Sequence, residues 1–164
     1  MSNVIGMSRH RRSAPTQKRF QPSPEGVAYT TLLRVADRMG GYFQGLFSPF
    51  EISGQHYNVL RILRGAEPDG LPTLTIAERL IERAPGITRM IDRLEAKALV
   101  RRKRCEDDRR CVYCRLTEKG LRLLERLDEP VYQANRAVFR GLSEAELQRL
   151  TALLDKALAG VEED

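Results

Sequence analysis

Apolar residues recur at helical spacing along most of the chain, and the pattern changes clearly in one segment. A first helix is predicted over about 24–47, because proline suits the first position of a helix and Ser23 can cap it. A second helix is predicted to follow the capping residue Ser53 and to end before Gly65. From Val100 to Thr117 apolar and polar residues alternate, which is typical of strands. The pattern therefore predicts a mainly α-helical chain with a small β-hairpin.

The middle of the chain predicts a short helix followed closely by a longer one. Thr75 and Glu78 have the spacing of a capping box, so we expect about two helical turns, ending at residue 81 or 82. Residues 82–84 form a tight connector, and Pro85 can begin the next helix. The spacing i, i+3, i+4, i+7, i+11 marks the buried face of that longer helix: Ile87, Met90, Ile91, Leu94 and Ala98. Short helix, tight turn and longer helix form the helix-turn-helix pattern.

The opposite face of the longer helix carries short polar groups and guanidinium groups, namely Thr88, Arg89, Asp92 and Arg93. A strongly basic segment follows it, with two predicted strands joined by the tip sequence CEDDRR. A polar helix face followed by a basic hairpin favours a groove-reading element with flanking phosphate contacts. The alternative interpretation is a solvated helix followed by a charged loop.

Positive charge is concentrated in two segments of the 164-residue chain. The net charge is +6, while residues 1–20 and residues 83–110 carry +5 each, so the remainder carries −4. Such a concentration is typical of a protein that binds a polyanion. Residues 1–22 are polar and basic and are predicted to be a flexible arm, followed by a single domain over 23–164.

Two more helices are predicted after the hairpin. Thr117 can cap a helix that reaches about Phe139, and Pro130 should bend it or divide it into two pieces. A capping box from Ser143 to Glu146 announces the last helix. Long apolar helices at both chain ends leave more hydrophobic surface than a small core needs, which indicates dimerisation. The dimerisation helices are placed at about 24–47 and 118–161, around a winged helix-turn-helix at about 52–117.

Several separate motifs occur in order between Leu74 and Gly120: T-R-x-I-D-R-L-E, L-V-x-R, D-R-R and L-T-x-x-G. With these motifs the chain resembles the MarR family of bacterial transcriptional regulators over roughly residues 25–160. The resemblance implies an obligate homodimer with a winged helix-turn-helix at each lower corner and interlocked N- and C-terminal helices. It implies that residues 85–97 enter the major groove, that Arg110 reaches the minor groove, and that Asp108 orients a wing arginine. Ala98 stands where the family often carries glycine, so the turn there must form without an easily left-handed residue.

The residues that we expect to contact DNA lie on the predicted recognition helix and wing. Arg89 is the candidate for base reading, because a guanidinium can make two hydrogen bonds to guanine; phosphate or solvent is its alternative. Arg93 is expected either to contact DNA or to pair with neighbouring acids. Only one side of the first wing strand is expected to face phosphate, because side chains alternate along a strand. The full set is Pro85, Gly86, Thr88, Arg89, Arg93, Arg101, Arg102, Arg104, Arg109 and Arg110.

The three cysteines, Cys105, Cys111 and Cys114, lie within ten residues of one another in the wing. A redox switch is one interpretation, because nearby arginines lower the pKa of a thiol; the alternative is small residues tolerated on a wing. A zinc site would need about four ligands, and the two histidines lie far from the cysteines in sequence. We therefore predict no metal and no other cofactor.

Effectors of the family often bind a cleft between the dimerisation helices and the DNA-binding lobe. Candidate lining residues here are Tyr42, Phe43, His56 and Tyr57, for a small aromatic or phenolic effector; the alternative is that these rings belong to the core. No catalytic triad, carboxylate pair or glycine-rich phosphate loop occurs, so the sequence does not predict an enzyme.

The sequence as a whole predicts a homodimeric, sequence-specific regulator of duplex DNA, with repression as the favoured role. Its operator would be pseudo-palindromic, with half-sites about one helical turn apart. The absence of a long apolar run predicts a cytoplasmic protein without a membrane partner. The alternatives are a redox sensor that uses the wing cysteines and an architectural binder without sequence preference.

Overall fold

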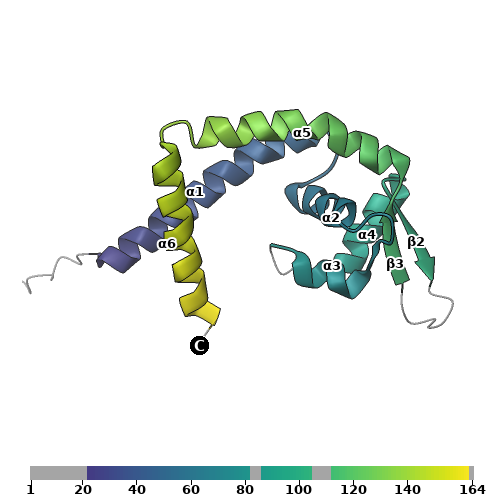
Figure 1. Cartoon of the computed structure of the whole chain (residues 1–164), viewed down its shortest axis with the longest axis horizontal. Helices are drawn as coiled ribbons and strands as arrows, with labels where there is room; N and C mark the ends of the chain where they lie inside the picture. Colours follow the sequence, from purple (N-terminus) through teal and green to yellow (C-terminus); the bar gives the residue numbers. More distant parts are fainter. Residues whose placement is uncertain (1–21, 82–85, 105–111, 163–164) are drawn as a thin grey trace, which may run out of the picture. The chain divides into compact units, whose positions relative to one another are not determined.

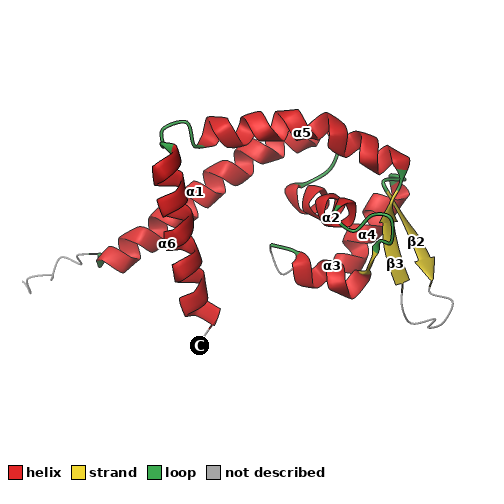
Figure 2. Cartoon of the chain, in the orientation of Figure 1, coloured by secondary structure: helices red, strands yellow, loops and turns green. Residues whose placement is uncertain are grey.

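The computed structural model describes residues 22–81, 86–104 and 112–162 of the chain. Along these residues it is mainly helical, with a small antiparallel sheet (Figure 1), and Figure 2 shows how few residues the strands occupy. The predicted class, mainly α with a small β-wing, is confirmed. The elements in chain order are α1 (Pro24–Phe47), η1 (Ser48–Phe50), α2 (Gly54–Arg64), β1 (Leu71–Pro72), α3 (Thr73–Arg79), α4 (Ile87–Ala96), β2 (Val100–Arg104), β3 (Val112–Leu116), α5 (Glu118–Val138) and α6 (Glu144–Glu162).

Four helices begin at the capping residues that the sequence predicts. Ser23, Ser53 and Thr117 each accept a hydrogen bond from a backbone amide in the first turn of α1, α2 and α5. Ahead of α6, the Ser143 amide donates to the Glu146 carboxylate at 2.8 Å, and the Glu146 amide donates back to the Ser143 hydroxyl at 3.4 Å. Local side-chain chemistry therefore sets these four helix starts.

The predicted start of the third helix is wrong. α3 begins at Thr73, so Thr75 lies inside the helix and no capping box forms with Glu78. The physical reason lies just before the helix, where the two residues of β1 pair with β3. This pairing carries the chain directly from the sheet into α3, and Pro72 precedes the helix without a side-chain cap.

The wing contains three antiparallel strands in the order β1-β3-β2. In the β2–β3 ladder, Val100 pairs with Leu116 and Arg104 pairs with Val112. The sequence pattern misses β1, because its two residues follow a turn-rich segment and are held by a partner about forty positions away. The predicted hairpin is thus the larger part of a three-stranded sheet.

One apolar cluster joins α2, α3, α4, the wing and the first half of α5. Full burial of a leucine or isoleucine side chain stabilises a fold by roughly 1.5–3 kcal/mol. This region therefore has a core of its own. The largest fully buried side chains are Leu60, Leu63, Ile76, Ile91, Leu94, Leu124 and Leu127.

The L-T-x-x-G motif after the wing has a packing explanation. Thr117 donates a hydrogen bond to the Ala98 carbonyl at 2.7 Å. Gly120 lies so close to the Leu99 carbonyl that a β-carbon at this position would collide with it. The first turn of α5 is thereby seated on the turn that ends α4. From there α5 continues as one helix through Pro130, so the expected division into two pieces does not occur.

The chain divides into two compact units, Met1–Val35 and Ala36–Asp164. The described part of the first unit is the start of α1, which exposes apolar side chains: Val27, Tyr29, Leu32, Leu33 and Val35. In the second unit, every described side chain of α6 is exposed or half-buried. The exposed apolar residues of α6 are Leu153, Leu154, Leu158 and Val161. The expectation of one domain over 23–164 stays a prediction.

Candidate nucleic-acid interface

The helix α4 buries one face and exposes the other. Met90, Ile91 and Leu94 are buried in the core, and Ile87 is half-buried. The predicted two-faced helix is confirmed over these residues. Its outward face presents a threonine, two arginines and an aspartate to solvent: Thr88, Arg89, Asp92 and Arg93.

The N-terminus of α4 has no side-chain cap among the described residues. Gly86, which precedes the helix, has a φ of 129°, a conformation that other residues rarely adopt. An added β-carbon would meet nothing within 4 Å, so glycine serves the backbone conformation here and not a close contact. The amides of the first turn consequently remain available to an anion. Pro85 lies outside the described residues.

The other end of α4 forms a Schellman motif built on Ala98. Leu99 donates its amide hydrogen to the Leu94 carbonyl at 2.9 Å, and Ala98 donates to the Glu95 carbonyl at 2.8 Å. Ala98 has a φ of 55°, which costs a non-glycine residue about 1–2 kcal/mol. The prediction that Ala98 belongs to the buried face is wrong, because it is exposed and lies beyond the last turn of the helix.

Arg102 is half-buried, and its side chain is bonded to α4. Its guanidinium donates to the Asp92 carboxylate at 2.6 Å, to the Glu95 carboxylate at 3.1 Å and to the Thr88 carbonyl at 3.1 Å. Its amide donates to Glu95 at 3.1 Å as well. These contacts hold β2 against α4, a structural role that the sequence did not predict, and the expected DNA contact of Arg102 stays a prediction. The sequence contains one signal of these contacts, because Asp92 and Glu95 lie three positions apart on the helix that precedes Arg102.

The contacts of Arg102 with α4 also affect the charge of the outward face of that helix. Arg102 offsets the Asp92 and Glu95 carboxylates, which would otherwise repel phosphate. Arg89 and Arg93 are exposed, and within the described residues neither makes a hydrogen bond or an ion pair. The guanidinium groups of Arg89 and Arg93 therefore make the surface around them positively charged.

Arg101 and Lys103 are exposed on the opposite side of β2 from Arg102. Arg101 pairs across the ladder with Arg115, whose guanidinium turns away to the Asp69 carbonyl at 2.8 Å. The prediction omitted Lys103, although strand alternation alone places it on the side of Arg101. Arg101 is thus exposed and Arg102 half-buried on opposite sides of the strand, and the expectation that only one side faces phosphate stays a prediction.

Several wing predictions cannot be placed on this surface. Arg104 is the last residue of β2 and pairs with Val112, and its side chain is not described. The remaining predicted residues of the wing tip lie outside the described residues: Cys105, Asp108, Arg109, Arg110 and Cys111.

Cys114 does not suit the redox role that the sequence suggested. Its side chain is 0% exposed, and its Sγ lies 3.6 Å from the Thr73 hydroxyl. Burial raises the pKa of the Cys114 thiol, which disfavours the reactive thiolate. The redox expectation is therefore corrected for Cys114, which fills the core beneath the sheet.

Two of the predicted effector residues pack as rings in the core, and one lies at a cavity. Phe43, Phe47 and Tyr57 stack in series, with ring centroids 6.3 Å and then 4.7 Å apart, and Tyr57 is buried. Tyr42 meets Phe43 edge-on but remains exposed. Of the predicted residues, Tyr42 alone lines a described cavity of about 510 Å³, between the end of α1 and the second half of α5. Phe43 and Tyr57 thus follow the alternative interpretation of these rings as core.

His56 has a structural task that the sequence analysis missed. The Ser53 amide donates to its Nδ1 at 3.1 Å, which completes a capping box in which histidine takes the usual place of glutamate. Burial lowers the pKa of His56, and the charges of Arg93 and Lys97 lower it further. His56 therefore has a capping role at the start of α2, and it does not line the cavity at Tyr42.

The described residues contain no group of three or more His, Cys, Asp or Glu side chains arranged to hold a metal ion. None of the described helices combines the length and the hydropathy that spanning a bilayer requires.

Comparison with known proteins agrees with this geometry. The model of the MarR family matches residues 52–112, which run from the residue before the α2 cap to the start of β3. A solved MarR transcription factor from Planctomyces limnophilus is 44% identical, with a TM-score of 0.66; the match covers 84% of this chain and 98% of that one.

Among the similar solved structures are two complexes with DNA. The complex of S. aureus MepR with DNA is 26% identical, with a TM-score of 0.74, and the match covers 80% of this chain and 97% of MepR. A cysteine-to-serine mutant of MarR from E. coli, complexed with operator DNA, is 26% identical, with a TM-score of 0.73 and coverage of 82% and 96%. Together with the 44% identity over nearly the whole Planctomyces protein, these matches show that the chain belongs to the MarR family of winged-helix transcription regulators.

Proposed function

We propose that the protein is a homodimeric repressor that binds a pseudo-palindromic operator in duplex DNA and leaves it when a small effector binds. The observation that carries the proposal is the outward face of α4. There Arg89 and Arg93 are exposed, while the other face of the helix is buried in the core. A rigid helix that presents guanidinium groups can place them against guanine edges in a major groove.

The surroundings of α4 support DNA as the partner. The acids on the outward face are already offset by Arg102, and Arg101 adds an exposed cation on the neighbouring strand. The uncapped first turn of the helix adds amides that can meet a phosphate. One continuous segment of the chain, α4 and the wing, would therefore supply both the base contacts and the phosphate contacts.

The homodimer is supported by the terminal helices. Leucines and valines on α1 and α6 are exposed and are not covered by the other residues that the structure describes. In a two-fold symmetric dimer, each protomer would cover these residues of its partner. The dimer would then present two recognition helices to one duplex. Half-sites about one helical turn apart follow from that symmetry. MepR and E. coli MarR, in whose structures DNA is present, share the architecture on which this argument depends.

Control by a small aromatic or phenolic effector belongs to the proposal as well. The cavity at Tyr42 supports it, because one phenol, the Gln133 amide and otherwise apolar residues line a space of a size suited to small ligands. An effector in such a cavity would weaken DNA binding if it fits a conformation that cannot span both half-sites.

The test is selection from random duplexes with the full chain, followed by footprinting on the enriched sequence. We expect one inverted repeat, with the two protected half-sites about 10 base pairs apart. Enrichment of a single half-site would contradict the dimer. Enrichment of no sequence, with good affinity for every duplex, would replace the proposal by an architectural role.

Repression has its own test. A reporter promoter that contains the selected repeat should lose activity when the protein is produced, and scrambling the repeat should abolish that loss. An increase in reporter activity would show an activator.

A further inference from the structure

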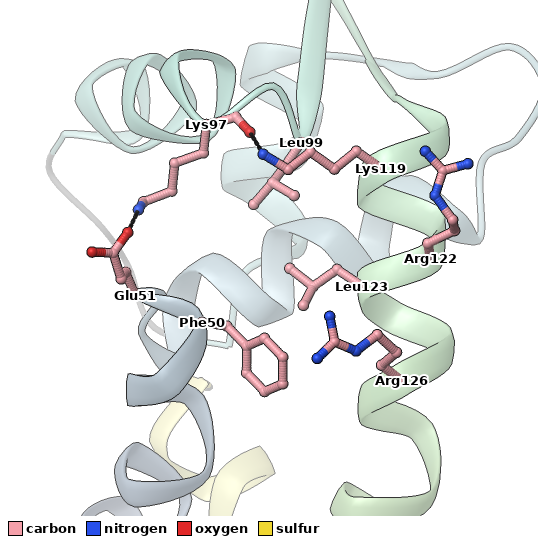
Figure 3. Close-up of a pocket in the computed structure, with 8 residues that line it drawn as sticks. All are labelled: Phe50, Glu51, Lys97, Leu99, Lys119, Arg122, Leu123 and Arg126. Atoms are coloured by element: carbon pink, nitrogen blue, oxygen red, sulfur yellow. Dashed lines mark hydrogen bonds and ion pairs between the residues drawn. The ribbon is translucent and has the colours of Figure 1, made fainter.

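A second cavity lies where η1, the turn after α4 and the first half of α5 meet (Figure 3). Its volume is about 380 Å³, which falls within the range of small-molecule sites. The apolar part of its lining comes from Phe50, Leu99 and Leu123. This cavity contains none of the residues that the sequence analysis assigned to an effector.

The charge of the lining is strongly one-sided. Four of the eight lining residues are cations, namely Lys97, Lys119, Arg122 and Arg126, and the single acid is Glu51. The lining therefore carries a formal charge of +3, next to apolar side chains. A monoanion would leave most of this charge unmatched, whereas a ligand with two negative charges would match it better.

The present partners of these cations are weak. Lys97 pairs with Glu51 at 2.6 Å, but the Glu51 side chain is 81% exposed. Arg122 pairs with Glu118, and both of these side chains are largely exposed. The Arg126 guanidinium lies 5.0 Å from the centre of the Phe50 ring. Exposed pairs contribute little to stability, so a bound anion could replace them at low cost.

We propose that this cavity binds a small organic dianion with a compact apolar body. Two carboxylates, or one phosphate, would meet the lysine and arginine side chains, which are the usual donors to such groups. The body would lie against Phe50, Leu99 and Leu123.

The position of the cavity couples it to the recognition helix. Lys97 is the C-cap of α4, and its carbonyl accepts a hydrogen bond from Lys119 at 2.8 Å (Figure 3). A dianion would draw Lys97 away from Glu51, which anchors that helix end to η1. Release from DNA by this route rests on the proposed function, whereas binding in the cavity does not.

Calorimetry with the full chain, in the absence of DNA, tests the site. The probes are phthalate, phenyl phosphate and, as the monoanion, benzoate. We expect at least one dianion to bind about tenfold or more tightly than benzoate, with an affinity that falls as salt rises. Preference between the two dianions distinguishes a dicarboxylate site from a phosphate site. Binding of neither dianion more tightly than benzoate would overturn the proposal.

Three variants sharpen the test. Arg122→Gln should weaken dianion binding by about tenfold, and the matched control Arg136→Gln, on the same helix but outside the cavity, should leave it unchanged. Glu51→Gln should strengthen binding, because it removes the one acid and frees Lys97. This opposite sign separates a ligand site from a structural cluster. Equal effects of Arg122→Gln and Arg136→Gln would contradict the site.

Operator binding is then measured with and without the tighter dianion. Weaker operator binding supports the coupling, and an unchanged affinity removes the coupling while the calorimetric site stands. If the chain binds no operator at all, the proposed function fails, and calorimetry still decides the cavity.

Discussion

The winged-helix region and the terminal helices use their apolar residues in opposite ways. Between α2 and the first half of α5, leucines and isoleucines are fully buried within the chain. On α6 and at the start of α1, leucines at the same helical spacing are about half exposed. The first region supplies its own core, whereas the second needs another surface. Apolar periodicity therefore predicts a helix, but it does not show whether the apolar face packs within the chain or against another molecule.

The largest effect should come from charge placed on the exposed leucines of α6. The double variant Leu154→Glu/Leu158→Glu should be monomeric with its winged-helix region folded, because neither side chain belongs to the buried core of that region. Operator affinity should fall by about 100-fold or more, since the two half-sites no longer bind as one unit. Light scattering and fluorescence anisotropy measure the two results.

Lys156→Glu, on the other side of α6, is the matched control and should remain dimeric. A dimer that survives the double variant with unchanged affinity would show that α6 is not the interface.

Two glycines contrast the regions directly. Gly120→Ala should lower the free energy of unfolding by about 1–3 kcal/mol, because the added methyl group collides with the Leu99 carbonyl. Gly41→Ala, on α1, meets nothing within 4 Å and should raise helix stability by up to about 1 kcal/mol. Urea unfolding measures both. A stability loss at Gly41 as large as that at Gly120 would indicate that α1 is closely packed in the assembled protein.

Two neighbouring arginines on β2 separate bracing from DNA contact. Arg102→Met should lower the free energy of unfolding by about 1 kcal/mol, a modest value because its pairs are partly exposed, and it should also weaken operator binding. Arg101→Met should leave stability unchanged and reduce the salt dependence of binding by about one phosphate contact. Equal behaviour of the two variants in urea unfolding and in a salt titration would refute this separation.

The smallest effect concerns two alanines at the end of α4. Ala98→Gly should stabilise the protein by about 1 kcal/mol, because glycine accepts the left-handed conformation at no steric cost. Ala96→Gly, at the last residue of the same helix, should destabilise it by up to about 1 kcal/mol. Thermal unfolding should therefore shift in opposite directions. A loss of stability in both variants would show that the Ala98 turn is not left-handed in solution.

Local chemistry made much of the fold predictable. Ser53, Thr117 and Ser143 begin helices because a hydroxyl near the first amides is favourable in any context. The two faces of α4 follow from spacing alone, and so does the hairpin of β2 and β3. Each of these features depends on residues that are close in sequence or on a regular period.

The features that sequence reasoning missed depend on distant partners. Arg102 and Arg101 are the same residue type in one basic run, and their roles differ because one meets Asp92 and Glu95 across the fold. Thr73 begins α3 because β1 pairs with a strand about forty residues later. The cation cluster around Phe50 combines three separate segments of the chain, so no motif announces it.

Base reading by the outward face of α4 is the central claim, and Arg89 tests it most directly. The measurement compares Arg89→Ala with Arg140→Ala, an exposed arginine outside α4 and the wing, on the selected operator and on a scrambled duplex. We expect Arg89→Ala to lower operator affinity by about 10- to 100-fold, with little change on the scrambled duplex and little effect of Arg140→Ala on either. Equal, small losses for both variants on both duplexes would contradict it.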